Sequence, residues 1–360
     1  MKKIYVSLLL IAIGGLGFNR MEDNTNNMKN IDTFLRNKVD KLNSPSVQYA
    51  FFDLDSTIYE FSYGDRDIKE RKQVDSATTY NLFSVTKTFT ALAVLQLVQE
   101  GTINLHSPVS KYLEDFPYTD EITVEQLLNH SSGIPNPLPL KWIHLQSEHD
   151  SFDKKDFFTP LFQKHKNLKY KPGYKFNYSN LGYVLLGQLI EKVSGKSYEN
   201  YVMENIIRKV GANSEMLTFQ IKSDQHAKGY QRSWSFTNMI LGLLLDKDKY
   251  MDKAEGKWKP FKNFYINGTP YGGLIGSRQG LIKYGQALMK TYGGQNEVKQ
   301  FSLSQKVRKM HNCSGFQPIL IHSRKKTKRT SCFDLLRFFY DFRSFCLIIA
   351  ISASRSTILL

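Results

Sequence analysis

Cysteine is nearly absent from this chain of 360 residues and is confined to one end of it. The three cysteines are Cys313, Cys332 and Cys346, so the first 312 residues contain none. This excludes a disulfide framework for the main body and a zinc site built from CxxC pairs. The eight histidines are scattered, with no HxH or HxxxH spacing among them. We therefore predict no metal and no cofactor.

Acidic residues are scarce relative to basic ones, and the imbalance is uneven along the chain. The net charge is +16, but residues 306–360 hold eleven Lys/Arg and only two Asp, a net +9 that leaves +7 for the other 305 residues. The body shows no basic, aromatic-interleaved face typical of nucleic-acid binding, so we expect no nucleic-acid partner. With 41% hydrophobic and 23% charged residues, the composition is that of a folded soluble protein.

The first 17 residues have the pattern of a secretory signal peptide. Lys2 and Lys3 precede an apolar run over residues 4–13, and Gly15-Leu16-Gly17 supplies small residues for cleavage. The run is short for a transmembrane helix; an uncleaved membrane anchor and a buried strand are the alternatives. The polar, Asn-rich stretch that follows makes residues 18–30 a predicted linker. We expect an extracytoplasmic protein, periplasmic or secreted, with possible membrane association through this N-terminal segment.

Residues 31–305 have the patterning of a folded domain. The patterning predicts a helix over 31–39, a strand hairpin over 47–54 and 57–62, and helices over 86–100, 124–128 and 183–193. The helix over 86–100 is apolar nearly all round, which is typical of a helix buried inside a domain, and Gly101 ends it. Helices dominate the stretch from about residue 105 to 210.

The first candidate catalytic element is Ser84-Val85-Thr86-Lys87, at the start of that buried helix. Residues three apart on a helix share one face. A serine at a helix N-terminus lies where a developing negative charge is stabilised. A lysine on the same buried face would lose solvation, which favours its neutral amine as a base for the serine. Ser-x-x-Lys alone is a weak signal, because an N-capping serine beside a solvated lysine has the same pattern.

The second element is Tyr178-Ser179-Asn180, ahead of the helix over 183–193. A tyrosine beside a lysine ammonium can shuttle a proton, and an asparagine amide can bind a substrate amide. An ordinary turn with Tyr178 as a packing residue is the alternative. A third stretch, residues 127–135 (LLNHSSGIP), is interpreted as a helix end and a turn, with His130 as a structural histidine rather than the partner of a serine.

Taken together and in this order, the three elements resemble the serine β-lactamase and penicillin-binding-protein family in its class C sense, with D-alanyl-D-alanine carboxypeptidases and esterases as relatives. Residues 101–113 (GTINLHSPVSKYL), 227–230 (AKGY) and 272–275 (GGLI) support the resemblance, which covers residues 32–305. It implies an α/β (α+β) fold in which helices flank an antiparallel sheet, beside a mainly helical subdomain.

The resemblance also implies a reaction and a site. Ser84 would be the nucleophile that forms an acyl-enzyme, Lys87 its base partner, Tyr178 the proton shuttle and Asn180 a substrate contact. The substrate would be an amide or ester: a D-Ala-D-Ala peptide, a β-lactam or a small ester. The Ser-Val-Thr-Lys and Tyr-Ser-Asn sequences are more similar to the carboxypeptidase and esterase branches than to the β-lactamases proper.

The C-terminal part departs from the family pattern. The family carries Lys-Thr-Gly or His-x-Gly on a late strand, and neither occurs in residues 280–360. The basic and apolar tail over 306–360 occupies the place of the last strands. We interpret it as the product of a reading-frame shift near residues 305–320, or as a divergent, membrane-associating tail. We therefore expect the C-terminal strands to be missing, half of the oxyanion hole to be lost, and activity to be weak or absent.

Two other functions fit parts of the sequence. The chain could be an inactive relative that binds a cell-wall peptide or a partner, which the absent third motif favours. Asp53-Leu54-Asp55-Ser56-Thr57 resembles the first motif of Mg²⁺-dependent haloacid-dehalogenase-like phosphatases, with Asp53 and Asp55 as the acidic pair. The later acidic motif that such a phosphatase needs is absent from the sequence.

Overall fold

The computed structural model describes residues 24–41, 44–233, 245–292, 319–322 and 344–349. The predicted signal peptide over 1–17 and most of the predicted tail lie outside these residues. In the part of the chain that is described, no helix is long and apolar enough to cross a membrane.

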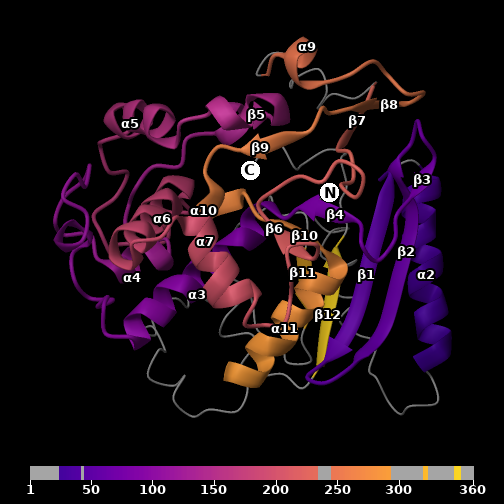
Figure 1. Ribbon diagram of the computed structural model, residues 1–360, viewed down its shortest axis with the longest axis horizontal. Helices are drawn as coiled ribbons and strands as arrows, with labels where there is room; N and C mark the ends of the chain where they lie inside the picture. Colours follow the sequence, from indigo (N-terminus) through magenta and orange to yellow (C-terminus); the bar gives the residue numbers. More distant parts are fainter. Residues whose placement is uncertain (1–23, 42–43, 234–244, 293–318, 323–343, 350–360) are drawn as a thin grey trace, which may run out of the picture.

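A five-stranded antiparallel sheet forms one side of the molecule (Figure 1). Its order is β11-β12-β1-β2-β3. The strands are β1 (Ser46–Asp53), β2 (Thr57–Asp67), β3 (Lys72–Gln73), β11 (Ile319–His322) and β12 (Ser344–Ile349). The predicted hairpin of residues 47–62 is thus confirmed, and Gln48 pairs with Ser62 on one side and with Ile349 on the other.

The expectation that the C-terminal strands are missing is wrong for two of them. Strand β12 pairs with β1 over residues 344–349, and β11 pairs with β12. The edge of β1 would otherwise present unpaired N–H and C=O groups, and the SFCLII sequence of β12 is rich in the aromatic and β-branched residues that strands favour. β11 ends the sheet, and no further strand lies beside it among the described residues.

Helices cover both faces of this sheet because β1 is apolar on both. Val47 and Tyr49 pack with Leu35 of α2 (Asn24–Asp40), whereas Ala50 and Phe52 belong to the main core on the opposite face. Helix α11 (Arg278–Tyr292) covers that second face and packs against β1. The alternation of period two along β1 therefore positions one helix on each side.

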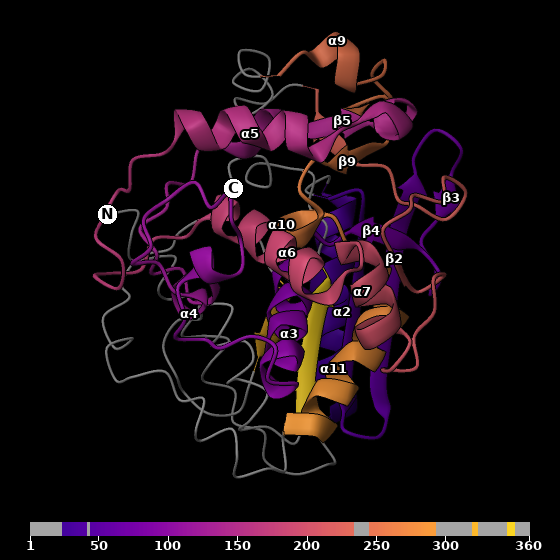
Figure 2. The same cartoon turned by 60° about the vertical axis from the view of Figure 1, so that its left-hand side comes forward.

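The rest of the body is mainly helical, as predicted. Helix α3 (Thr86–Gln99) packs against α6 (Asn180–Ser194) and the short α10 (Thr269–Gly272) (Figure 2). Around them lie α4 (Val124–Leu128), α5 (Lys154–Lys164) and α7 (Tyr198–Val202). The helical region also contains a strand that the sequence did not predict, β5 (Ile143–Leu145), paired with β9 (Phe264–Ile266).

Short elements connect these parts. Strand β10 (Ile275–Ser277) lies between β4 (Thr79–Asn81) and β6 (Leu217–Thr218). A second short pair joins β7 (Tyr230–Arg232) to β8 (Trp258–Pro260), with α9 (Lys247–Tyr250) nearby. The α/β (α+β) architecture expected from the sequence, an antiparallel sheet flanked by helices plus a helical subdomain, is therefore present.

The phosphatase-like motif is used by the turn between β1 and β2. The Asp53 carboxylate accepts hydrogen bonds from the backbone N–H groups of Asp55 and Ser56 and from the Ser56 hydroxyl. These bonds hold the pKa of the Asp53 carboxyl below its usual range. The strand before it pairs antiparallel rather than in a parallel βα unit. Asp53 thus has a structural role, and the described residues contain no cluster of three or more His, Cys, Asp or Glu able to hold a metal.

Candidate active site

Ser84 lies on a single 3₁₀ turn, Phe83–Val85, that leads from β4 into α3. The preceding Phe83 has φ +45°, a left-handed conformation that is strained for an aromatic residue. The backbone of the preceding residue is fixed in place, because the Leu82 N–H donates to the Leu274 carbonyl at 2.8 Å. Strained residues of this kind cluster at active sites. The turn leaves the Ser84 side chain half-buried beside the first turn of α3.

Lys87 is fully buried, one turn along from Ser84. Its Nζ donates to the Ser84 Oγ at 3.1 Å and to the Tyr271 carbonyl of α10 at 2.7 Å. Three aromatic rings surround the ammonium group, those of Tyr178, Tyr183 and Tyr271, with centroids 5.0, 5.6 and 5.2 Å away. Hydrogen bonds and ring contacts of this kind stabilise a charge that burial would otherwise disfavour.

Tyr178 completes the group from a distant part of the chain. Its hydroxyl lies 2.8 Å from the Ser84 Oγ, although the two residues are 94 positions apart. The next residue, Ser179, caps α6 by accepting from the Gly182 N–H, and its own hydroxyl donates to the Pro135 carbonyl. Ser84, Lys87 and Tyr178 were predicted from separate segments, and the fold brings Lys87 and Tyr178 within hydrogen-bonding distance of Ser84.

His130 supports Tyr178 from behind rather than pairing with Ser84. Its Nδ1 accepts from the Ser179 N–H at 3.2 Å, and its carbonyl accepts from the Asn177 N–H at 2.6 Å. The imidazole lies 4.5 Å from the Tyr178 ring, centroid to centroid. Burial, reinforced by the charge of Lys87, holds the pKa of His130 well below its usual range. His130 is thus a neutral residue of the turn, in agreement with its interpretation from the sequence.

Asn180 lies two residues after Tyr178, at the start of α6. Its backbone N–H donates to the Asn136 side chain at 3.0 Å. Its side chain is buried, and the Oδ1 atom has no hydrogen-bond partner among the described residues. A buried acceptor without a donor is costly, so this oxygen is suited to receive a hydrogen bond from a bound ligand.

Sequence reasoning missed the part played by α10. Tyr271 supplies both a carbonyl and a ring to Lys87, and it directly precedes the Gly272-Gly273 pair that the sequence analysis noted only as a family feature. The contact is close because Pro270 packs against the bare backbone of Gly187 in α6, where a Cβ atom would lie 2.1 Å from the proline. The sequence feature that positions α10 is therefore a glycine and a proline 83 residues apart, and local patterning does not reveal that they meet.

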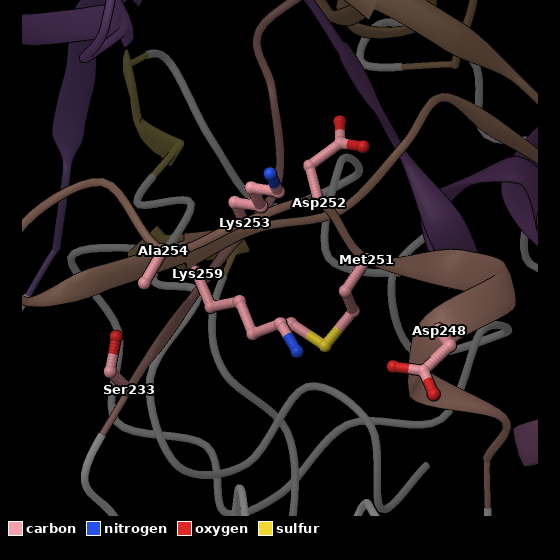
Figure 3. A pocket seen from close by; sticks show the side chains of 7 residues that line it. All are labelled: Ser233, Asp248, Met251, Asp252, Lys253, Ala254 and Lys259. Atoms are coloured by element: carbon pink, nitrogen blue, oxygen red, sulfur yellow. The ribbon is translucent and has the colours of Figure 1, made fainter.

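A hollow lies beside α9 and β8 (Figure 3). Its lining comes from Ser233, Asp248, Met251, Asp252, Lys253, Ala254 and Lys259. The charges in this lining balance, and none of Ser84, Lys87 or Tyr178 belongs to it.

Comparison with known proteins identifies the family to which the chain is similar. Residues 31–314 match the Beta-lactamase family. Protein flp of Staphylococcus aureus strain COL is 30% identical over 209 residues, which cover 56% of this chain and 41% of that protein. This chain thus spans less than half the length of that relative.

Two solved structures are also similar. The octameric penicillin-binding protein homologue from Pyrococcus abyssi superimposes with a TM-score of 0.58 at 28% identity, over 73% of this chain and 56% of that one. A penicillin-binding protein from Bacillus halodurans gives a TM-score of 0.52 at 26% identity, over 71% and 72% of the two chains. The family match covers most of the sequence and carries all three predicted motifs, so this chain belongs to the Beta-lactamase family.

Proposed function

We propose that this protein is a serine hydrolase that forms an acyl-enzyme at Ser84 and acts on an amide or an ester. The observation that carries the proposal is the position of the Ser84 Oγ, 2.8 Å from the Tyr178 hydroxyl and 3.1 Å from the Lys87 Nζ. A nucleophile within reach of a base that is itself oriented by a third group is the arrangement required for covalent catalysis. Membership of the Beta-lactamase family supports the same reaction.

The proton of Ser84 has a defined route in this arrangement. Lys87 Nζ donates to a carbonyl, which only accepts, and to the Ser84 Oγ. The Ser84 Oγ also lies 2.8 Å from the Tyr178 hydroxyl, where either oxygen can be the donor, and we assign Ser84 as the donor. In this route Tyr178 acts as a phenolate, favoured by the nearby Lys87 ammonium: it takes the proton as Ser84 attacks and returns it to the leaving group. A neutral Lys87 acting as the base directly is the other route, and replacing Tyr178 separates the two.

Stabilisation of the tetrahedral intermediate is the weak point of this site. The Ser84 N–H supplies one oxyanion donor, whereas the sequence lacks the Lys-Thr-Gly or His-x-Gly motif whose strand supplies the other in this family. Loss of one such donor lowers kcat by about 10²–10³. We expect slow turnover, and an inactive relative that binds a cell-wall peptide or partner is the alternative that this absence favours.

We place the substrate outside the cytoplasm, where D-Ala-D-Ala peptides, β-lactams and small esters are available to an exported protein. The predicted signal peptide over 1–17 supports this location, and the same segment would tether the protein to the membrane if it stays uncleaved. The name penicillin-binding protein, carried by two structural relatives, favours ligands of the peptide and β-lactam type.

Burst kinetics with a chromogenic ester test the proposal. An acyl-enzyme mechanism with slow deacylation gives a rapid release of about one alcohol per protein followed by a slow steady state. We expect this burst in the wild type and no burst in Ser84→Ala. A folded wild-type protein that shows neither burst nor steady-state release with esters or penicillins would support the inactive alternative instead.

A further inference from the structure

A strip of uncompensated positive charge runs into the segment that carries Tyr178. The basic strip is residues 164–175 (KHKNLKYKPGYK), and no Asp or Glu occurs between Asp156 and Glu191. Its five lysines are all exposed, and none has an ion-pair partner within the described chain: Lys164, Lys166, Lys169, Lys171 and Lys175. Two lysines outside the strip are paired, Lys154 with Glu199 at 2.5 Å and Lys192 with Glu114 at 3.0 Å.

The strip is fixed against the active-site turn by its backbone. The Lys169 N–H donates to the Gly133 carbonyl and the Gly173 N–H to the Ser131 carbonyl, each at 2.8 Å. Gly133 has φ +77°, and a Cβ atom there would lie 2.0 Å from the Tyr170 carbonyl. Only glycine allows this approach. The lysines are therefore held on a defined track that ends three residues before Tyr178.

Two of the ammonium groups are gathered around one ring. The Nζ atoms of Lys175 and Lys169 lie 3.7 and 5.8 Å from the centroid of Tyr170. They are thus within about 10 Å of each other, roughly one Debye length at 0.1 M salt, so their repulsion is only partly screened. No acidic residue of the strip offsets it. A bound anion would offset this repulsion. The neighbouring Tyr174, with 73% of its surface exposed, offers an apolar contact beside such an anion.

We propose that the basic strip is a docking surface for a flexible linear polymer whose charges are phosphate groups. Several point charges spread along an extended segment fit repeated charges on a chain better than they fit one small anion. Lysine binds phosphate as a point charge, whereas planar carboxylates are best recognised by the arginine fork, and the strip contains no arginine. The Lys175 ammonium covers one face of the Tyr170 ring, so that face is not open for stacking on a nucleic-acid base.

Binding of the full-length protein to inorganic polyphosphate, measured by fluorescence anisotropy at several salt concentrations, tests this proposal. The strip variant replaces all five lysines with glutamine. The control variant makes the same change at five exposed lysines outside the strip, Lys38, Lys72, Lys111, Lys209 and Lys257. Both variants carry the same net charge and keep the basic C-terminal tail, so they differ only in where charge is lost.

We expect the strip variant to bind at least about tenfold more weakly than the control at 0.1 M salt. Its slope of log K against log salt should fall by about 0.7 for each lysine that contacts a phosphate. Equal binding by the two variants would overturn the proposal, as would binding of poly-L-glutamate as tight as that of polyphosphate. Ser84→Ala should bind like the wild type, so this test stands apart from the proposed catalytic function.

Discussion

Replacing Tyr178 with phenylalanine tests the proton route with little disturbance of the fold. The substitution removes only the hydroxyl that lies 2.8 Å from the Ser84 Oγ. The ring contacts, 4.5 Å to His130 and 5.0 Å to the Lys87 Nζ, do not depend on that hydroxyl. Because Tyr178 is only half-buried, we expect the free energy of unfolding to change by about 1 kcal/mol or less.

The expected effect on reactivity is much larger than the effect on stability. A positioned general acid–base contributes about 10²–10⁴ to rate, equivalent to about 3–5 kcal/mol of activation free energy. Tyr178→Phe should therefore slow the second-order labelling of Ser84 by a fluorophosphonate at least about a hundredfold. Intact-protein mass spectrometry over time gives this rate, and thermal unfolding gives the stability of the same samples.

Tyr183→Phe is a matched control with the opposite expected signature. The Tyr183 ring also faces Lys87, but its hydroxyl is fully buried and donates to the Leu128 carbonyl at 3.0 Å. We expect this variant to lose about 1–3 kcal/mol of stability while it labels at nearly the wild-type rate. If Tyr178→Phe labels as fast as the wild type, the proposed route is refuted and Lys87 must take the proton directly.

Three further perturbations follow from the same contacts. Lys87→Met should abolish labelling of Ser84 yet leave the protein folded in thermal melts, because it replaces a fully buried cation with an apolar chain of similar length. Gly187→Ala should destabilise the protein and slow labelling by forcing Pro270 and its helix away from Lys87, whereas Gly182→Ala in the same helix, with its nearest contact at 3.7 Å, should be neutral or stabilising. Burial lowers the pKa of His226 to about 4, so below pH 6.5 the unfolded chain binds a proton at His226 that the folded chain does not bind until about pH 4. His226 should therefore contribute a loss of about 3 kcal/mol to the free energy of unfolding between pH 7 and pH 4. Denaturant titrations should show a smaller loss in His226→Gln.

The sequence allowed the candidate reactive residues to be named because each carries its signal locally. Ser84 and Lys87 are three residues apart on one helix, and Tyr178 directly precedes a capped helix start. Their mutual distances could not be read from either segment, since the Ser84–Tyr178 contact closes a loop of 94 residues. The resemblance to a family supplied that link, and the structure brings the three side chains together.

The features that sequence reasoning missed are non-local. Pairing of β12 with β1 joins residues about 300 positions apart, and an apolar run in a basic tail does not reveal which strand it will meet. The contact of the Tyr271 carbonyl with Lys87 depends on a glycine in another helix. The net charge of the body did not reveal the basic strip either, because a total does not show which lysines have acidic partners, as Lys154 and Lys192 do.

The most direct test of the central claim is the mass of the intact protein after incubation with a fluorophosphonate, followed by peptide mapping. We predict a single adduct on Ser84 that is absent from Ser84→Ala and still forms in Tyr183→Phe. An adduct on a different residue, or none on wild-type protein shown to be folded, would contradict the assignment of Ser84 as an activated nucleophile.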